Sequence, residues 1–158
     1  MTSAACRAGR SRRSERRKRT QMPTSTSRVL VTGGAGYLGS ILCEHLLAAG
    51  HAVTVVDNFL FGQTPLFHLC ANPRFDLVRG DARDESTMAR ALKDADVVIP
   101  LAALVGAPLC DRDPVGATGV NLEAIRLVTR LRSPRQLIVY PDRKSTRLNS
   151  SHEWISRM

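Results

Sequence analysis

"VTGGAGYLGS", residues 31–40, is the stretch of sequence that decides the fold. Its glycines satisfy two overlapping spacings: G-x-G-x-x-G through Gly34, Gly36 and Gly39, and G-x-x-G-x-x-G when Gly33 replaces Gly34. In either case the first glycine turns the chain off a strand, the second lets backbone approach a pyrophosphate, and the third lets a helix pack closely. A P-loop is excluded because the sequence has no G-x-x-x-x-G-K-[ST] pattern.

The residues on both sides of this turn complete a nucleotide-binding pattern. An apolar run at 28–32 predicts a strand, helical spacing at 37–50 predicts a helix that ends on a glycine, and "AVTVVD" at 52–57 predicts a second strand. Asp57 closes that strand, and a carboxylate there accepts hydrogen bonds from both ribose hydroxyls of NAD. It would repel the 2′-phosphate of NADP, so the pattern predicts NAD. The alternative is an ordinary glycine-rich turn with a helix-capping Asp.

Strands and helices continue to alternate along the chain. The patterns predict strands at 75–81, 96–103 and 136–140, and helices at 84–95 and 115–132. Pro100 predicts that the fourth strand finishes near it, and the long connection at 58–74 contains a candidate short helix, "LFHLC". The predicted fold class is therefore α/β, a Rossmann-type doubly wound parallel sheet, truncated after about five strands.

Two further segments place candidate site residues at strand ends. In "RGDARD" (79–84), Asp81 is positioned to accept a hydrogen bond from an adenine amino group, with the Ala82 backbone beside it. Asp84 better fits an N-terminal cap for the next helix. In "LAALVGAP" (101–108), small residues let backbone lie against the cofactor's phosphates and nicotinamide ribose. Ordinary close packing is the alternative for that segment.

The net charge of +9 is concentrated at the two ends of the chain. Residues 1–20 carry eight Lys/Arg against one Glu, and residues 142–158 carry four against two acidic residues, so the middle is neutral. We interpret residues 1–27 as a basic disordered tail, or as translation from a start upstream of Met22. A basic arm that binds nucleic acid is the alternative, but it lacks aromatic residues, which argues against a nucleic-acid partner.

The composition narrows the class of protein further. The sequence contains no run of eighteen apolar residues, so no membrane span is predicted. The N-terminus lacks the apolar core of a secretory signal, so the predicted location is cytoplasmic. The four cysteines are scattered, without the spacing of zinc sites or redox pairs, which predicts reduced thiols and no metal site.

"VYPDRKS" (139–145) contains a Tyr-x-x-x-Lys spacing, Tyr140 with Lys144. Proton transfer by such a pair needs both side chains on one helix face, whereas Tyr140 ends a predicted strand and Pro141 follows it. We therefore predict that the pair is not catalytic. The adjoining "DRKSTRLNSSH" resembles a translated sequencing adapter, so residues 142–158 are interpreted as a non-native tail.

Taken in order, "VLVTGGAGYLGS", "VVDN", "GDARD", "LAALVG" and "VNLEAIRLV" resemble the N-terminal half of the NAD-dependent epimerase/dehydratase family, which are extended short-chain dehydrogenase/reductases. Pro100 departs from the family pattern. Asn121 matches a family asparagine near the cofactor, with a buried polar group of a helix as the alternative. The resemblance implies that the pyrophosphate contacts Gly33, Gly36, Tyr37 and Leu38, and that the adenosine ribose contacts Asp57 and Asn58. It places Asp81 and Ala82 at the adenine, and Leu101, Ala102 and Ala103 along the inner face of the cofactor.

The resemblance also implies a function for residues 28–141 as a partial NAD-binding domain. The parent would be a nucleotide-sugar epimerase, dehydratase or reductase that forms a homodimer, and its catalytic Ser/Thr and Tyr-Lys pair would lie beyond this chain. The chain as given is then predicted to be inactive, with no catalytic residue of its own. The alternative is a non-catalytic NAD-binding module of the same fold.

Overall fold

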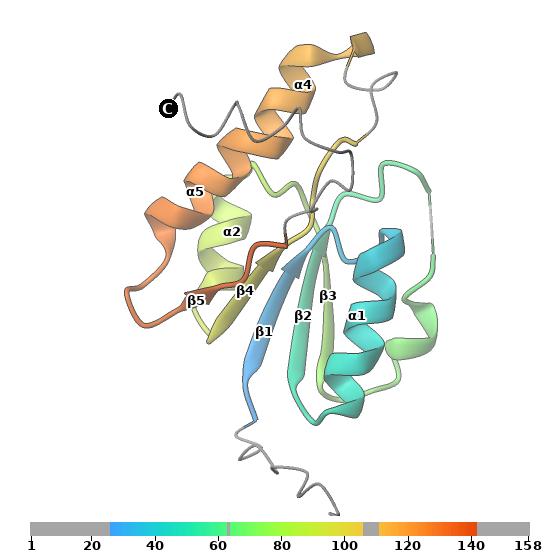
Figure 1. Ribbon diagram of the computed structural model, residues 1–158. Helices are drawn as coiled ribbons and strands as arrows, with labels where there is room; N and C mark the ends of the chain where they lie inside the picture. The colour runs from blue at the N-terminus through green and yellow to red at the C-terminus, as the bar shows by residue number, and fades with distance from the viewer. Residues whose placement is uncertain (1–25, 63, 106–110, 142–158) are drawn as a thin grey trace, which may run out of the picture.

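The computed structural model describes residues 26–62, 64–105 and 111–141 (Figure 1). Within these residues five strands form one parallel sheet, in the order β3-β2-β1-β4-β5. The strands are β1 (Arg28–Thr32), β2 (Ala52–Asp57), β3 (Phe75–Arg79), β4 (Val97–Pro100) and β5 (Leu137–Ile138). The predicted Rossmann-type sheet is confirmed.

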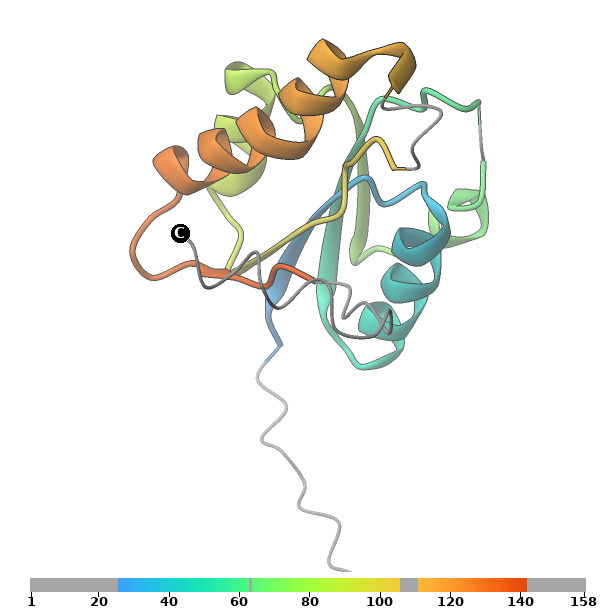
Figure 2. The same ribbon diagram turned by 45° about the horizontal axis from the view of Figure 1, so that its top comes forward.

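Helices cover both faces of this sheet. Figure 2 shows α1 on one side of the strands and the helix containing α5 on the other. The helical elements are α1 (Tyr37–Ala48), η1 (Phe67–Leu69), α2 (Glu85–Leu92), α4 (Pro114–Thr118), η2 (Gly119–Glu123) and α5 (Ala124–Leu131). The helix expected at 115–132 is present, but a π-helical turn, η2, interrupts it between α4 and α5.

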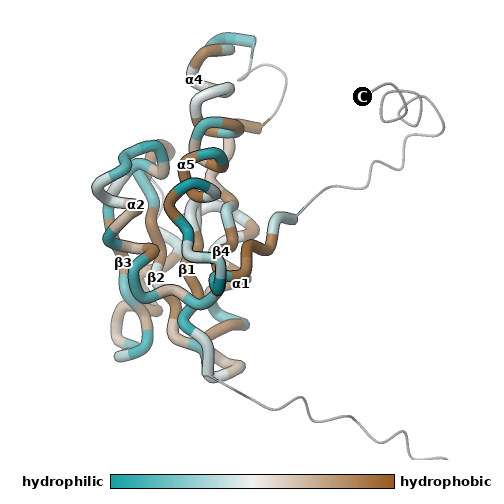
Figure 3. The backbone as a smooth tube through the Cα atoms, turned by 90° about the vertical axis from the view of Figure 1, so that its left-hand side faces the viewer, coloured by the Kyte–Doolittle hydropathy of each residue, from teal (hydrophilic) through white to brown (hydrophobic). Residues whose placement is uncertain are grey.

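Alternation along β1 divides the core into two layers. Val29 and Val31 pack with Cys43 and Leu47 of α1, while Leu30 packs on the opposite face with residues of α2 and α5. In Figure 3 hydrophobic and hydrophilic colours alternate along α5, as expected for a helix with one face on the core. A sheet that is covered on both faces explains the unbroken apolar runs of the strands.

Three strands end before the residue that the sequence pattern predicts: β3 ends at Arg79, β4 at Pro100 and β5 at Ile138, in place of residues 81, 103 and 140. The end of β4 at Pro100 agrees with the prediction made from the proline itself. β5 is an edge strand and pairs with β4 only through Val97↔Leu137 and Val98↔Ile138. One more hydrogen bond, from Val139 N to Val98 O at 2.9 Å, continues the alignment before Pro141.

Several predictions concern residues outside the described part of the chain: nearly all of the basic tail, the non-native tail, Lys144, and residues 106–108. Among the described residues no helix is long and apolar enough to cross a membrane. Cys43 and Cys70 are free thiols, and burial raises the pKa of Cys43 to about 11.

Candidate cofactor site

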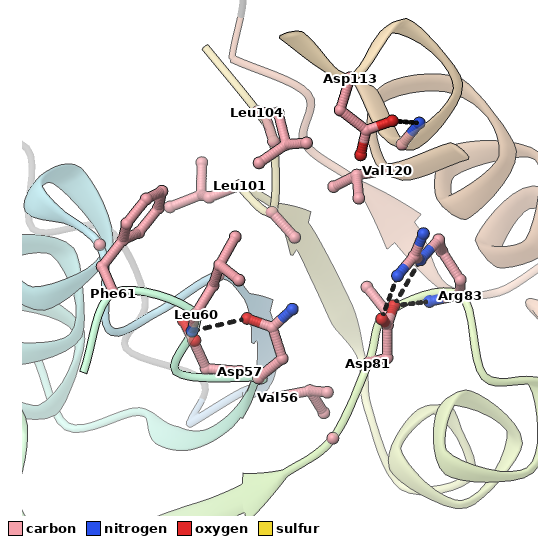
Figure 4. Close-up of a pocket in the computed structure, with 18 residues that line it drawn as sticks. Val56, Asp57, Leu60, Phe61, Asp81, Arg83, Leu101, Leu104, Asp113 and Val120 are labelled. Carbon is pink, nitrogen blue, oxygen red and sulfur yellow. Dashed lines mark hydrogen bonds and ion pairs between the residues drawn. The ribbon is translucent and has the colours of Figure 1, made fainter. Parts of the chain in front are cut away.

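The carboxyl ends of the strands surround a cleft of about 260 Å³, the first cleft (Figure 4). Its walls come from the segments that follow β1, β2, β3 and β4, and from the start of the α4–α5 helix. A crevice at this edge of an open parallel sheet is the usual position of a ligand in such folds. The lining includes nine predicted site residues: Gly33, Gly36, Asp57, Asn58, Asp81, Ala82, Leu101, Ala102 and Ala103.

The glycine turn is packed so tightly that side chains would not fit. Gly33 has φ +73°, and a Cβ added to it would lie 2.5 Å from the Ala102 nitrogen. A Cβ on Gly39 would lie 2.6 Å from the Gly34 Cα. Gly36 also borders the first cleft, but its closest such contact is longer, 3.3 Å to the Gly33 oxygen. The positive φ belongs to Gly33, so the G-x-x-G-x-x-G spacing is the one that matches the backbone.

The N-terminus of α1 follows directly from this turn. Gly36 is the N-cap and offers no side chain to the first-turn amides, so the helix end presents backbone donors and positive dipole. The two predicted residues of that first turn lie outside the first cleft. Tyr37 is 88% exposed, and Leu38 lines a neighbouring apolar cavity.

Asp57 connects the glycine turn to the loop after β2. Its carboxylate accepts hydrogen bonds from Ala35 N at 2.9 Å and from Phe59 N at 2.8 Å, one on each oxygen. A carboxylate has about four lone-pair sites, so Asp57 keeps acceptor capacity toward the cleft that it lines. Asn58 is exposed beside it and accepts from Leu60 N at 3.0 Å. The Asp57 carboxylate therefore stabilises the glycine turn and also faces the first cleft.

Asp81 and Asp84 have different partners. Asp84 is the N-cap of α2 and accepts from Thr87 N at 2.9 Å, which confirms its predicted role. Asp81 faces the first cleft and forms an ion pair with Arg83, with 2.6 Å between Oδ2 and Nη2. Hydrogen bonding to Arg83 lowers the pKa of Asp81, so this carboxylate is ionised at neutral pH. Sequence analysis missed Arg83, although its position two residues after Asp81 puts it within reach.

Asn121 lies on η2 and binds the backbone of the segment after β4. Its Oδ1 accepts from Leu104 N at 2.8 Å, and its Nδ2 donates to Leu104 O at 2.9 Å. Both ends of the amide are thus used to hold the segment that forms one wall of the first cleft. Asn121 itself lines the neighbouring apolar cavity, not the first cleft.

The neighbouring apolar cavity, which we call the second cleft, has a volume of about 560 Å³ and lies between the start of α1, the end of β4 and α5. Its lining is mostly apolar: Leu38, Pro100, Leu101, Ala102, Ala103, Val105, Asn121, Ile125, Tyr140 and Pro141. Tyr140 follows β5 in irregular backbone and is 60% exposed. It is not on a helix, which agrees with the prediction from Pro141. The described residues contain no cluster of side chains suited to a metal ion.

The strand order, the glycine turn and the position of the first cleft define a Rossmann-type nucleotide-binding domain. The family is more specific. The model of the NAD dependent epimerase/dehydratase family matches residues 29–137, so the chain belongs to that family.

Relatives of known activity and solved structures agree with this assignment. The chain is 33% identical over 99 residues to UDP-N-acetyl-alpha-D-glucosaminuronate decarboxylase of Bacillus cytotoxicus, which covers 63% of this chain and 30% of that enzyme. An epimerase from Methanothermobacter thermautotrophicus superposes with a TM-score of 0.68 and 27% identity, over 82% of this chain and 41% of that one. UDP-glucose 4-epimerase of Thermus thermophilus, in complex with NAD, gives a TM-score of 0.56 and 34% identity, over 66% and 33%. The chain thus spans less than half the length of each.

Proposed function

We propose that the first cleft binds NAD, with the pyrophosphate at the glycine turn and the adenosine between Asp57 and Asp81. The observation that carries this proposal is the convergence of four strand ends on one cleft lined by Gly36, Asp57 and Asp81. Gly36 leaves room for the pyrophosphate beside the N-terminus of α1. The family is NAD-dependent, and one solved relative is a complex with NAD.

Asp57 would make the site selective for NAD over NADP. Its two occupied lone pairs fix the carboxylate at the end of β2, and the remaining acceptor sites suit two ribose hydroxyls. A 2′-phosphate at that position would bring two negative groups together.

Equilibrium binding to the 158-residue chain tests both statements. We expect NAD to bind at least about tenfold more tightly than NADP, and the Asp57→Asn variant to reduce this preference. Asp76→Asn, at an exposed position of β3 that does not line the first cleft, is the matched control. A folded chain that binds neither dinucleotide would overturn the proposal.

We further propose that the chain supplies the NAD-binding part of an enzyme that acts on a nucleotide sugar. The relatives named above include a decarboxylase and an epimerase whose names specify UDP-linked sugars. When bound, NAD provides a hydride acceptor for oxidation of a sugar carbon. The described residues would bind and orient the cofactor, while proton transfer and most sugar contacts would come from elsewhere in the protein.

A non-catalytic NAD-binding module is the second candidate, and the position of Tyr140 is compatible with both. This side chain lies in irregular backbone after β5 and not on a helix beside the first cleft. Sequencing the source DNA onward from the codons for residues 139–141 separates the two candidates. A continuous frame that encodes a Tyr-x-x-x-Lys helix favours the enzyme, and a frame without one favours the module.

A further inference from the structure

Arg83, in the loop between β3 and α2, forms two side-chain hydrogen bonds to the carboxylate of Asp81. Its Nε donates to Oδ1 at 3.0 Å, and its Nη2 donates to Oδ2 at 2.6 Å. This is the fork geometry in which a planar guanidinium fixes the plane of a carboxylate. The Arg83 backbone N–H also donates to Oδ1, at 2.8 Å. Figure 4 shows the pair on one wall of the first cleft.

The Asp81 carboxylate keeps part of its hydrogen-bond acceptor capacity for a ligand. A carboxylate has about two acceptor sites on each oxygen. Oδ1 accepts from both the backbone N–H and Nε of Arg83, whereas Oδ2 accepts from Nη2 alone. One acceptor site on Oδ2 is therefore left to a ligand, and its direction is set by the guanidinium.

Arg83 also lies close to the α4–α5 helix. A Cβ added to Gly119 would lie 3.5 Å from Cδ and Nη1 of Arg83, so the stem of this side chain packs close to η2. Asp113, the N-cap of α4, also lines the first cleft and attracts the guanidinium. The half-exposed side chain thus lies between the β3–α2 loop and the α4–α5 helix.

We propose that Arg83 is a positioning residue that makes the site selective for adenine. It holds Asp81 so that the free acceptor site on Oδ2 meets the amino group at C6 of the base. This inference rests on the proposed binding of NAD in the first cleft. Without the fork, the carboxylate could rotate and follow a donor elsewhere on the purine edge, such as the N1–H of hypoxanthine.

The test compares NAD with nicotinamide hypoxanthine dinucleotide, in which a carbonyl replaces the C6 amino group. A hydrogen bond to a charged acceptor sets the scale, so we expect the wild-type chain to prefer NAD by about tenfold or more. Arg83→Met keeps the apolar stem and removes the fork, and should reduce this preference at least about threefold. Arg90→Met, which removes the same charge from an exposed position on α2, should leave the preference unchanged.

Two further variants distinguish fixation of Asp81 from simple charge. Arg83→Lys retains the charge without the fork, so its preference should resemble that of Arg83→Met. In an Asp81→Ala background, Arg83→Met should cause no additional loss of preference. Circular dichroism confirms that each variant is folded before its affinity is compared.

The outcomes separate this inference from the proposed function. If the wild-type chain prefers NAD but Arg83→Met retains the full preference, or weakens both dinucleotides equally, the role of Arg83 is wrong and NAD binding stands. Full retention by Arg83→Lys would also overturn it, because charge alone would then suffice. If the folded wild-type chain binds neither dinucleotide, the proposed function falls and this inference falls with it.

Discussion

The first half of the sheet (β1, β2 and β3) and the second half (β4 and β5) differ in how completely their strands are paired and covered. In the first half, β1 and β2 pair over five residue pairs, and Val31 and Val55 are fully buried. In the second half, β4 and β5 pair over two, and Leu137 of β5 is 59% exposed. The segment after β4 borders both clefts, so the boundary between the halves passes through it.

This difference separates cofactor binding from the rest of the site. Most groups proposed to contact NAD follow strands that are well paired, so their positions depend little on β5. The second cleft, by contrast, is lined by apolar side chains that remain accessible, such as Leu38 and Tyr140. We expect the first half to form a stable binding site and the second half to open more readily.

The largest expected effect is at the glycine turn of the first half. Gly33→Ala would combine a left-handed backbone with a 2.5 Å approach to Ala102 N, so it should lower the free energy of unfolding by at least about 3 kcal/mol. Gly62 also has positive φ, at +62°, but no atom lies within 4 Å of its Cβ position. Gly62→Ala should therefore cost only about 1 kcal/mol. Denaturant unfolding measures both, and equal losses would show that close packing at Gly33 contributes nothing.

A smaller loss is expected from Gln136, which joins β5 to the end of α2. Its buried amide donates to Leu92 O and Ala95 O and accepts from Ser133 N. Gln136→Ala should lower the free energy of unfolding by about 2 kcal/mol while the affinity for NAD stays within about twofold. Arg135→Ala, at the exposed neighbouring position, is the control. A large loss of NAD affinity in Gln136→Ala would show that the halves are not separable.

Asn121 tests the boundary between the halves. Asn121→Ala removes both bonds to the backbone of Leu104, so the segment at 101–105 should become less well fixed. We expect the dissociation constant for NAD to rise about threefold to tenfold and the free energy of unfolding to fall by about 1 kcal/mol. Calorimetric titration and denaturant unfolding measure these changes. An unchanged affinity would show that this wall of the first cleft needs no support from η2.

The smallest effect is a pH dependence at Asp84, the N-cap of α2. Hydrogen bonds from Thr87 and Ser86 lower its pKa from 3.8 to about 2. Because the folded pKa lies below the unfolded value, this stabilisation is complete above about pH 4 and is lost as the pH falls toward 2. The Tm difference between wild type and Asp84→Ala should be constant near neutral pH and shrink below about pH 4. A difference that persists unchanged in acid would contradict the pKa assignment, and Asp76→Ala is the control.

The sequence predicts those features that depend on neighbouring residues along the chain. The glycine spacing, the strand before it, Asp57 at the end of β2 and the Asp84 cap all depend on residues that are close in the sequence. Their patterns can therefore be recognised from the sequence alone. The grip of Arg83 on Asp81 depends on side-chain conformation, which composition and spacing do not specify. The bond of Asn121 to Leu104 spans 17 residues and depends on the π-helical turn. The length of β5 depends on its pairing with β4, a strand that is distant in the sequence.

NAD-induced shifts of backbone amide resonances in the 158-residue chain test the central claim most directly. If the first cleft binds NAD independently of the sheet edge, the largest shifts should come from residues 33–36, 57–61, 80–83 and 101–104, while Ile138 and Val139 remain unchanged. If a folded chain shows no shifts at saturating NAD, or if the shifts concentrate on β5 and the second cleft, the account is wrong.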